Sequence, residues 1–424
     1  MGRGRQAWVR CAMADTSNER LHALDAVRGF ALIAGIVFHA SVSFLPGPNG
    51  APLWIVTDSQ PSVALGVVFH LLHIFRMTTF FLIAGFFAHL TFHRRGARGF
   101  IADRAKRIAV PLLVGWPILF VAIVAVTIWA AVSAAHGRPL PPPPKYPGFP
   151  AFPLTHLWFL YLLLWLYAAT LLIRAIVARL DRAGRLRAGV DRVVRLAAAH
   201  PAGVALLAAP TALAFLGTPG WLPWFGVPTP DSSLVPNLAA SVAYFSAFGF
   251  GWLLHRQTQL LADWRRLWPA NLALALGFTI AELVLVGLTP AIHLPAGAAR
   301  LALAALYPLA AWSWTLALIG LALRFLSDFS PARRYIADSS YWLYLIHLPI
   351  VLALQVVVAP LDWPWPVKFA VILGVAFPLM LASYQLLVRH SFIGAILNGP
   401  RESRSRARKA EKAAISAAPQ SVQP

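Results

Sequence analysis

Long, nearly unbroken apolar stretches recur along the chain, separated by short polar or basic segments. Each stretch is close to the ~20 apolar residues that a helix needs to cross about 30 Å of hydrocarbon. The stretches lack the alternation of polar and apolar positions that is typical of a membrane β-barrel. The pattern therefore predicts an all-α fold, a polytopic membrane helical bundle of about ten transmembrane helices. The predicted helices cover residues 24–45, 63–92, 109–135, 156–178, 197–217, 237–256, 267–288, 299–325, 337–358 and 366–389.

The composition agrees with a membrane location. Hydrophobic residues make up 59% of the chain and charged residues 12%, whereas a soluble domain has about 45–50% and about 25%. The single cysteine, Cys11, cannot form an internal disulfide, which excludes a disulfide-stabilised secreted scaffold. The second predicted helix is long, which favours tilt or a kink. Pro201 and Pro210 interrupt the fifth, for which a merged or re-entrant segment is the alternative.

Basic residues are distributed unevenly among the connections, and Lys and Arg accumulate in cytoplasmic loops. With the N-terminus inside, 30 of the 36 basic residues fall in the segments predicted to be cytoplasmic, and four lie on the opposite side. We therefore predict that both termini are cytoplasmic. The same topology explains the formal net charge of +21 without a nucleic-acid partner.

Three regions are expected along the chain. Residues 1–23 form a cytoplasmic N-terminal arm, residues 24–397 a ten-helix membrane domain, and residues 398–424 a basic, disordered cytoplasmic tail. No cleavable signal peptide is predicted, because the arm contains acidic residues and no apolar core. The Pro-rich segment 137–153 predicts a stiff, extended outer loop.

Ionisable residues inside hydrocarbon are costly and usually face a bundle interior or a wet cavity. In the first helix, Asp25, Arg28 and His39 share one face, with about 16 Å along the axis between Arg28 and His39. Histidine exchanges protons near neutral pH, so a general-base role is open to His39. The alternative is an interfacial ion pair of Asp25 with Arg28 and a merely hydrogen-bonded His39.

The second helix carries His73 and Arg76 on one face. The charge of Arg76 near mid-span requires an anionic partner or water. A metal site formed by His70 and His73 is a weak alternative, since no carboxylate or cysteine cluster accompanies them.

Further polar residues lie at the ends and in the middle of other helices. Arg104 and Arg107, three positions apart, are able to bind phosphate groups through charge-assisted hydrogen bonds. His156 and Trp158 lie at the outer end of the fourth helix, and His347 lies near the middle of the ninth. Glu282, deep in the seventh helix, is either a substrate or proton contact or a buried neutral carboxyl.

The ordered motifs resemble a known family. They are Asp25-x-x-Arg28 with His39 behind it, then "FRMTTFFLIAGFF", Arg104-x-x-Arg107-Ile-Ala-Val-Pro, "HLWFLYLLL" and "SSYWLYLIHLPI". Together they are similar to the acyltransferase 3 family of integral-membrane acyltransferases, nearest to its glucans biosynthesis protein C branch. The sequence departs from the family in "FFLIAGFF", where Ser-Gly is commoner, and in having no fused hydrolase-like domain.

The resemblance implies an activity and roles for residues. It implies transfer of an acetyl or succinyl group from cytosolic acyl-CoA to a hydroxyl of an extracytoplasmic carbohydrate, in a bacterial inner membrane and without a metal. It implies that His39 is catalytic beside Arg28, with Asp25 or another acid orienting the charge. On the same basis we predict donor contacts and substrate contacts. The donor residues are Arg104, Arg107 and Arg76, and the substrate residues are His156, Trp158, His73 and His347.

A membrane transporter or flippase is the rival interpretation. It would move a glycan, a lipid-linked sugar or an anion, using the intramembrane His and Arg residues as a relay. No internal symmetry between the halves of the sequence favours it. A pure scaffold has little reason to keep Arg76 and several histidines in hydrocarbon.

Overall fold

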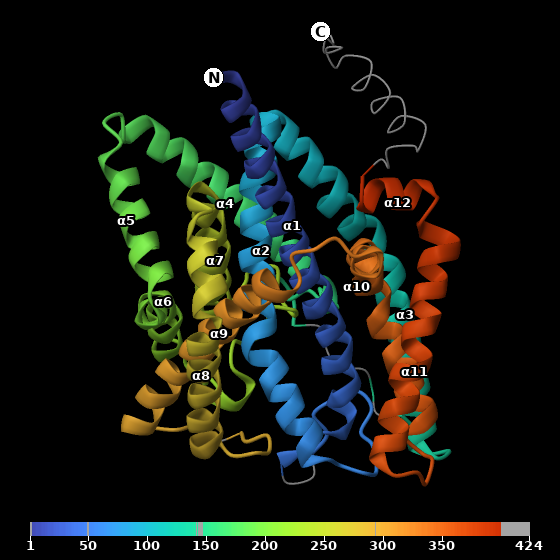
Figure 1. Cartoon of the computed structure of the whole chain (residues 1–424). Helices are drawn as coiled ribbons and strands as arrows, with labels where there is room; N and C mark the ends of the chain where they lie inside the picture. The colour runs from blue at the N-terminus through green and yellow to red at the C-terminus, as the bar shows by residue number, and fades with distance from the viewer. Residues whose placement is uncertain (1, 49–50, 141, 143–146, 293, 400–424) are drawn as a thin grey trace.

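The computed structural model describes residues 2–48, 51–140, 142, 147–292 and 294–399, and their regular secondary structure is helical (Figure 1). The α-helices are α1 (Gly2–Ser41), α2 (Val63–Arg104), α3 (Val110–Ala135), α4 (Trp158–Leu180), α5 (Arg185–Ala199), α6 (Val204–Leu216), α7 (Leu238–Leu254), α8 (Leu260–Val286), α9 (Gly297–Phe325), α10 (Pro331–Val358), α11 (Trp365–Ser383) and α12 (Phe392–Leu397). The predicted all-α helical bundle is confirmed.

The apolar stretches coincide with these helices. Eight stretches in the described residues are long and apolar enough to cross a membrane, and one of them, Val63–Ala135, contains both α2 and α3. Figure 1 shows α2 running the length of the bundle and α3 returning. The fifth predicted span corresponds to a shorter apolar helix, Pro201–Leu216, so a tenth crossing stays a prediction.

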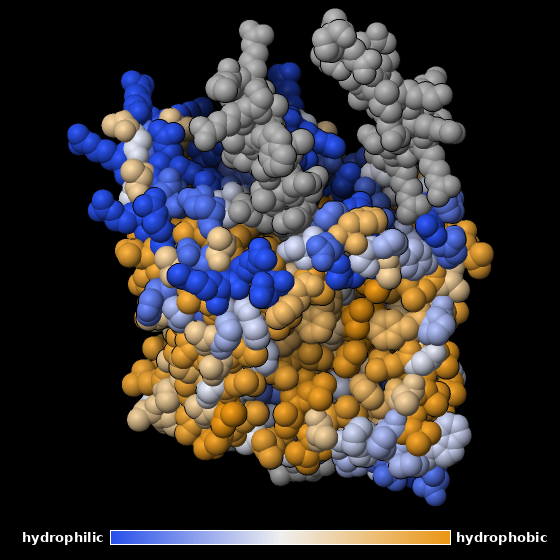
Figure 2. Space-filling model, viewed as in Figure 1, coloured by the Kyte–Doolittle hydropathy of each residue, from blue (hydrophilic) through white to orange (hydrophobic). Residues whose placement is uncertain are grey.

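The distribution of polar and apolar side chains on the surface agrees with a bundle that crosses a membrane. Figure 2 shows hydrophilic side chains gathered at the end of the bundle that carries the α4–α5 connection and α12, with a hydrophobic band below them. The helix α1 begins at Gly2, so the predicted arm runs without a break into the first span. Most of the predicted tail, from residue 400, lies outside the described residues, and the domain boundaries stay predictions.

The long helix α2 changes direction near its C-terminal end. Gly96 has φ 66° and ψ −178°, which interrupts α2 between the apolar run and Arg104. Glycine adopts this conformation without a Cβ clash. A π-helical turn, Ala105–Ala109, then leads into α3. This kink lies in the basic stretch that follows the predicted span 63–92, so a tilt or kink within that span stays a prediction.

The helix α1 lies inside the bundle, in contact with α2, α9, α10 and α11. Its small residues Ala31, Ala34 and Ala40 are buried, which allows close helix approach. Because α1 is central, its two polar positions, Arg28 and His39, lie within reach of several neighbouring helices.

The helices α2 and α7 meet at two glycines. A Cβ on Gly85 would clash with the carbonyl oxygen of Phe248, and a Cβ on Gly251 would clash with that of Leu82. Small residues at such crossings let membrane helices gain van der Waals contact. This contact fixes the position of α2, which carries Arg76.

We expect Gly251→Ala to lower the apparent melting temperature in detergent by several degrees, because overpacking costs about 1–3 kcal/mol. Gly249→Ala is the matched control, since nothing lies within 4 Å of an added methyl there. Tryptophan fluorescence during heating measures both. Equal melting temperatures for the two variants would contradict the tight crossing.

Candidate active site

A cavity of about 420 Å³ enters the bundle between α1, α2, α4 and α10. The volume falls within the range of small-molecule sites, about 300–1,000 Å³. Most of the residues singled out from the sequence line it. They are Asp25, Arg28, His39, Arg76, Arg104, Arg107, His156, Trp158 and His347.

One end of the cavity is charged. The Arg28 guanidinium lies 3.2 Å from the carboxylate of Asp25 and donates to the carbonyl oxygen of Ala337, also at 3.2 Å. Arg334 of α10 lies 3.7 Å from Asp25 and 3.1 Å from Asp338. These pairs hold two arginine side chains at the cavity wall.

The Arg-x-x-Arg pair lies at the same end, held by a buried acid. Asp103 lies 2.9 Å from Arg104 and 3.3 Å from Arg107. Arg104 also donates to the hydroxyl of Thr91 at 3.1 Å. One carboxylate therefore orients two guanidinium groups, as a site for an anionic ligand requires.

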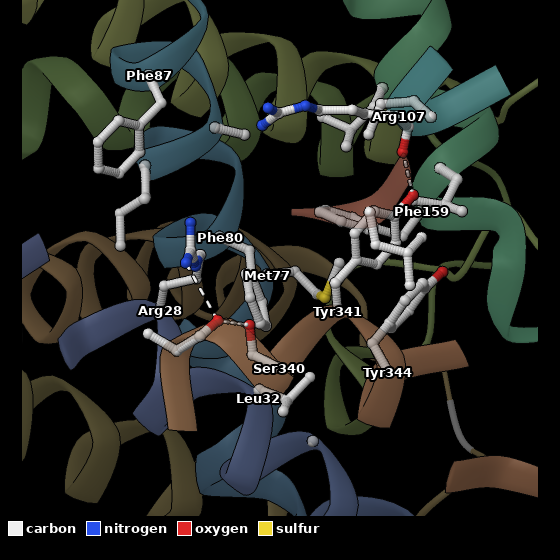
Figure 3. A pocket seen from close by; sticks show the side chains of 18 of the residues that line it. Arg28, Leu32, Met77, Phe80, Phe87, Arg107, Phe159, Ser340, Tyr341 and Tyr344 are labelled. Carbon is white, nitrogen blue, oxygen red and sulfur yellow. Dashed lines mark hydrogen bonds between the residues drawn. The ribbon is translucent and has the colours of Figure 1, made fainter. Parts of the chain in front are cut away.

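The middle of the cavity is largely apolar (Figure 3). Leu32, Met77, Phe80 and Phe159 contribute to its wall. Met77, Phe80 and Ala84 follow at helical spacing along α2, which explains why one face of that helix lines the cavity. Ala84, the alanine of "FFLIAGFF", is therefore part of the cavity wall.

Hydroxyl groups of α10 are fixed along the cavity. Tyr341 donates to the carbonyl oxygen of Arg107 at 2.5 Å, and Tyr344 donates to that of His156 at 2.7 Å. Ser340 donates to the carbonyl of Ala337 that also accepts from Arg28 (Figure 3). The tyrosines thereby join α10 to the turn before α4 and to the π-helical turn before α3.

Three imidazoles gather at the opposite end of the cavity. The ring centroids of His39 and His347 lie 5.1 Å apart, and those of His347 and His156 lie 5.2 Å apart. These residues come from α1, from α10 and from the turn before α4. The structure therefore brings together histidines that are far apart in the sequence.

Arg76 lies in the same region. Its guanidinium carbon lies 4.3 Å from the centre of the Phe38 ring. A Cβ on Gly35 would come within 2.8 Å of its Nη1, so glycine makes room for it on α1. No ion pair joins Arg76 to an acid of the described residues. This buried cation is available to an anionic ligand.

The geometry of two predicted contacts differs from the expectation. Asp25 lies about 21 Å along α1 from His39, because fourteen residues separate them; it therefore cannot orient that imidazole and belongs to the charged end. His73 does not line the cavity. Its ring stacks on Phe38 and Phe69, at 5.6 Å and 5.9 Å between centroids, so a substrate contact of His73 stays a prediction.

The described residues contain no group of three metal-ligating side chains. His70 lies 3.6 Å from the buried carboxylate of Glu282, and its Nδ1 lies 3.0 Å from the carbonyl oxygen of Trp224. His70 and Glu282, whose roles the sequence left open, therefore lie against each other, and neither lines the cavity.

Several cavity residues were not found from the sequence. Tyr341, Tyr344, Arg334 and Asp338 are the main ones. The aromatic run of α10 carries the tyrosines but resembles ordinary membrane-helix composition, and Arg334 resembles positive-inside anchoring. Only the packing of α10 against α1 distinguishes them.

Comparison with known proteins identifies the class of this site. The chain belongs to the acyltransferase 3 family, whose model, described as an acyltransferase domain, matches residues 21–385. This match contains all the cavity residues named above. The protein is therefore a multi-pass membrane acyltransferase, and the family expected from the motifs is confirmed.

Two curated relatives carry the same name. Glucans biosynthesis protein C of Escherichia coli (strain SMS-3-5 / SECEC) is 32% identical over 101 residues, which cover 24% of this chain and 25% of that protein. The protein of that name from Escherichia coli O1:K1 / APEC is 31% identical over 101 residues, with the same coverage. The chain spans about a quarter of the length of these relatives. No solved structure matches the chain.

We expect Ser340→Cys, in a chain whose Cys11 is changed to Ser, to react with a charged, membrane-impermeant thiol reagent added to inside-out vesicles, because Ser340 lines the cavity. Ser339→Cys is the matched control, since Ser339 is fully buried and is not in the cavity wall. Mass spectrometry of the labelled protein measures the difference. Equal labelling of the two cysteines would contradict an open cavity, and labelling only from right-side-out vesicles would reverse the predicted orientation.

Proposed function

We propose that this acyltransferase is an O-acyltransferase that transfers an acetyl or succinyl group from cytosolic acyl-CoA to a hydroxyl of an extracytoplasmic glycan or similar acceptor. The observation that supports this best is the polarity of the cavity. A cluster of arginines lines one end and a cluster of imidazoles the other, about 16 Å apart along α1. In the predicted orientation the arginine end faces the cytoplasmic side of a bacterial inner membrane.

The arginine end suits the phosphate groups of CoA. Arginine binds phosphate through paired, charge-assisted hydrogen bonds. Four arginines line this end, and three aspartates contact them, which leaves a net positive charge. Arg104 and Arg107 are the proposed phosphate ligands, with Arg28 beside them.

The apolar middle of the cavity suits the acyl arm of the donor. The thioester would extend along the Leu32, Met77 and Phe80 wall towards His39. Arg76 is buried and pairs with no acid in the described part of the chain, and it would meet the donor near its reacting end. A buried guanidinium there favours charge that develops on the thioester oxygen during attack.

His39 is the proposed general base. It takes the proton of the acceptor hydroxyl as the hydroxyl oxygen bonds to the thioester carbon, and the carbon–sulfur bond then breaks. The proton passes from the imidazolium to the departing thiolate, so the reaction consumes no net proton. Direct transfer is the simpler course, and an acyl-imidazole intermediate is its alternative.

The acceptor would approach from the imidazole end. Trp158 and His156 lie in the cavity wall there. The Pro-rich segment leads directly into this region, where Trp116 donates to the carbonyl oxygen of Pro153 at 2.9 Å. Residues 141 and 143–146 of that segment lie outside the described residues.

We expect purified protein to release free CoA from acetyl-CoA or succinyl-CoA only when a glycan acceptor is present, and His39→Ala to abolish this release. The exposed His390→Ala serves as the control for loss of an imidazole. A thiol-reactive dye measures turnover, and size-exclusion chromatography checks the fold. Retained turnover in His39→Ala would contradict the role of His39 as general base. Movement of a glycan across vesicle membranes without CoA release would instead favour a transporter.

We expect Arg104→Ala with Arg107→Ala to raise the KM for acyl-CoA about 10-fold or more, because each charged hydrogen bond contributes about 1.5–3 kcal/mol. The control removes two exposed arginines of the same segment, Arg94 and Arg98. Initial rates against donor concentration give both constants. An unchanged KM would show that the phosphates bind elsewhere.

A further inference from the structure

Backbone carbonyl groups fix the tautomers of two histidines in the imidazole cluster. Nδ1 of His347 lies 2.7 Å from the carbonyl oxygen of Tyr344, and Nε2 of His156 lies 2.8 Å from that of Leu345. A carbonyl oxygen only accepts hydrogen bonds, so each of these nitrogens carries a proton. In neutral rings, Nε2 of His347 and Nδ1 of His156 are therefore bare acceptors.

The Nδ1 atom of His39 requires a hydrogen-bond acceptor if it carries the proton of the ring. This Nδ1 atom is buried and has no hydrogen-bond partner among the described residues. The ring lies 5.0 Å from that of Phe38, 6.0 Å from that of Trp54 and 5.1 Å from that of His347. Phenylalanine offers no polar atom, and the nitrogens of Trp54 and of the neighbouring Arg76 only donate. Among these neighbours, the bare nitrogen of His347 is the acceptor.

Another histidine pair in the protein shows that the separation is suitable. The Nδ1 atoms of His89 and His255 lie 2.8 Å apart, and the centroids of these two rings are 4.8 Å apart. The corresponding centroid distance between His39 and His347 is 5.1 Å. The two separations are similar, so a hydrogen bond between His39 and His347 forms once the two nitrogens face each other, as is common when a catalytic contact tightens on substrate binding.

We propose that His347 is the positioning residue for His39. Its bare Nε2 accepts the Nδ1 proton of His39, which leaves Nε2 of His39 unprotonated and directed to the cavity. The proposal rests on the proposed function of His39 as general base. The carbonyl oxygen of Tyr344 in turn accepts the hydrogen bond that holds His347. The proposed hydrogen bonds therefore run from this backbone carbonyl through His347 and His39 to the acceptor hydroxyl.

A neutral imidazole here takes the place of the carboxylate that orients the histidine of a serine protease triad. During transfer, Nε2 of His39 gains the proton of the hydroxyl and then gives it to the thiolate. The Nδ1 proton stays with His39 throughout, held by His347. Both partners return to their starting protonation after each turnover.

Two substitutions of His347 separate positioning from packing. His347→Leu removes the acceptor, and we expect kcat to fall about 100-fold or more, with the KM for acyl-CoA unchanged within about twofold. His347→Gln restores an acceptor oxygen near the position of Nε2, and we expect it to recover at least a tenth of the kcat of the natural protein. His390→Leu is the control. Equal loss in the Leu and Gln variants, or a normal kcat in His347→Leu, would overturn the proposal.

A double variant and a spectroscopic measurement complete the test. We expect His39→Ala with His347→Leu to lose no more activity than His39→Ala, because residues that act as one unit are not additive. In ¹⁵N solid-state NMR, the imidazole signal of His39 is identified by its absence in His39→Ala. We expect this signal to show the Nδ1–H tautomer in the natural protein, and we expect that tautomer to be lost in His347→Leu. This readout does not depend on turnover. An inactive natural protein with the expected tautomer would overturn only the proposed function, and the opposite tautomer in an active protein would overturn only the role of His347.

Discussion

A charge buried in a membrane bundle is costly unless an opposite charge or a polar ligand meets it, and this constraint separates two buried cations in this protein. Lys368 binds both oxygens of Asp58, at 2.9 Å and 3.1 Å, with both side chains buried. Arg76 lines the cavity, lies over the face of Phe38 and forms no ion pair with an acid of the described residues. Nδ1 of His39, which lines the same cavity, has no hydrogen-bond partner in the described part of the chain. A buried cation that faces a cavity without an opposite charge is what a site for an anionic ligand requires.

The geometry of a single helix connects the two ends of the site. Because α1 rises 1.5 Å per residue, Arg28 and His39 face the same cavity about 16 Å apart. A ligand anchored by phosphate at the first can therefore present a reactive group at the second only if it is long and thin. This requirement agrees with an acyl donor that carries its thioester at the end of an arm, and it separates the donor from an acceptor that approaches from the imidazole end.

Helix periodicity predicted from sequence what lies within one helix, and it failed for what lies between helices. The common face of Arg28 and His39 followed from residue spacing, and the apolar runs gave all the predicted spans except the fifth, which corresponds to a shorter helix. The role predicted for Asp25, orienting the charge at His39, does not fit the same geometry, because about 21 Å along α1 separates the two residues. No local signal shows that Asp103 orients Arg104 and Arg107, or that Tyr341 and Tyr344 face the cavity. These facts depend on how α2, α3, α4 and α10 pack, which a single sequence does not encode locally.

The pairing of α1 with α10 explains why the imidazole cluster has a defined geometry. Arg28 donates to the carbonyl oxygen of Ala337 at one end of the site. At the other, Gln355 donates to the carbonyl oxygens of His39 and Ala40, at 2.9 Å and 3.3 Å. Two anchors on each helix fix both sliding and rotation, so the imidazoles of α1 and α10 cannot drift apart independently. The proposed hydrogen bond from His39 to His347 needs this rigidity, because an error of about 1 Å would remove such a contact.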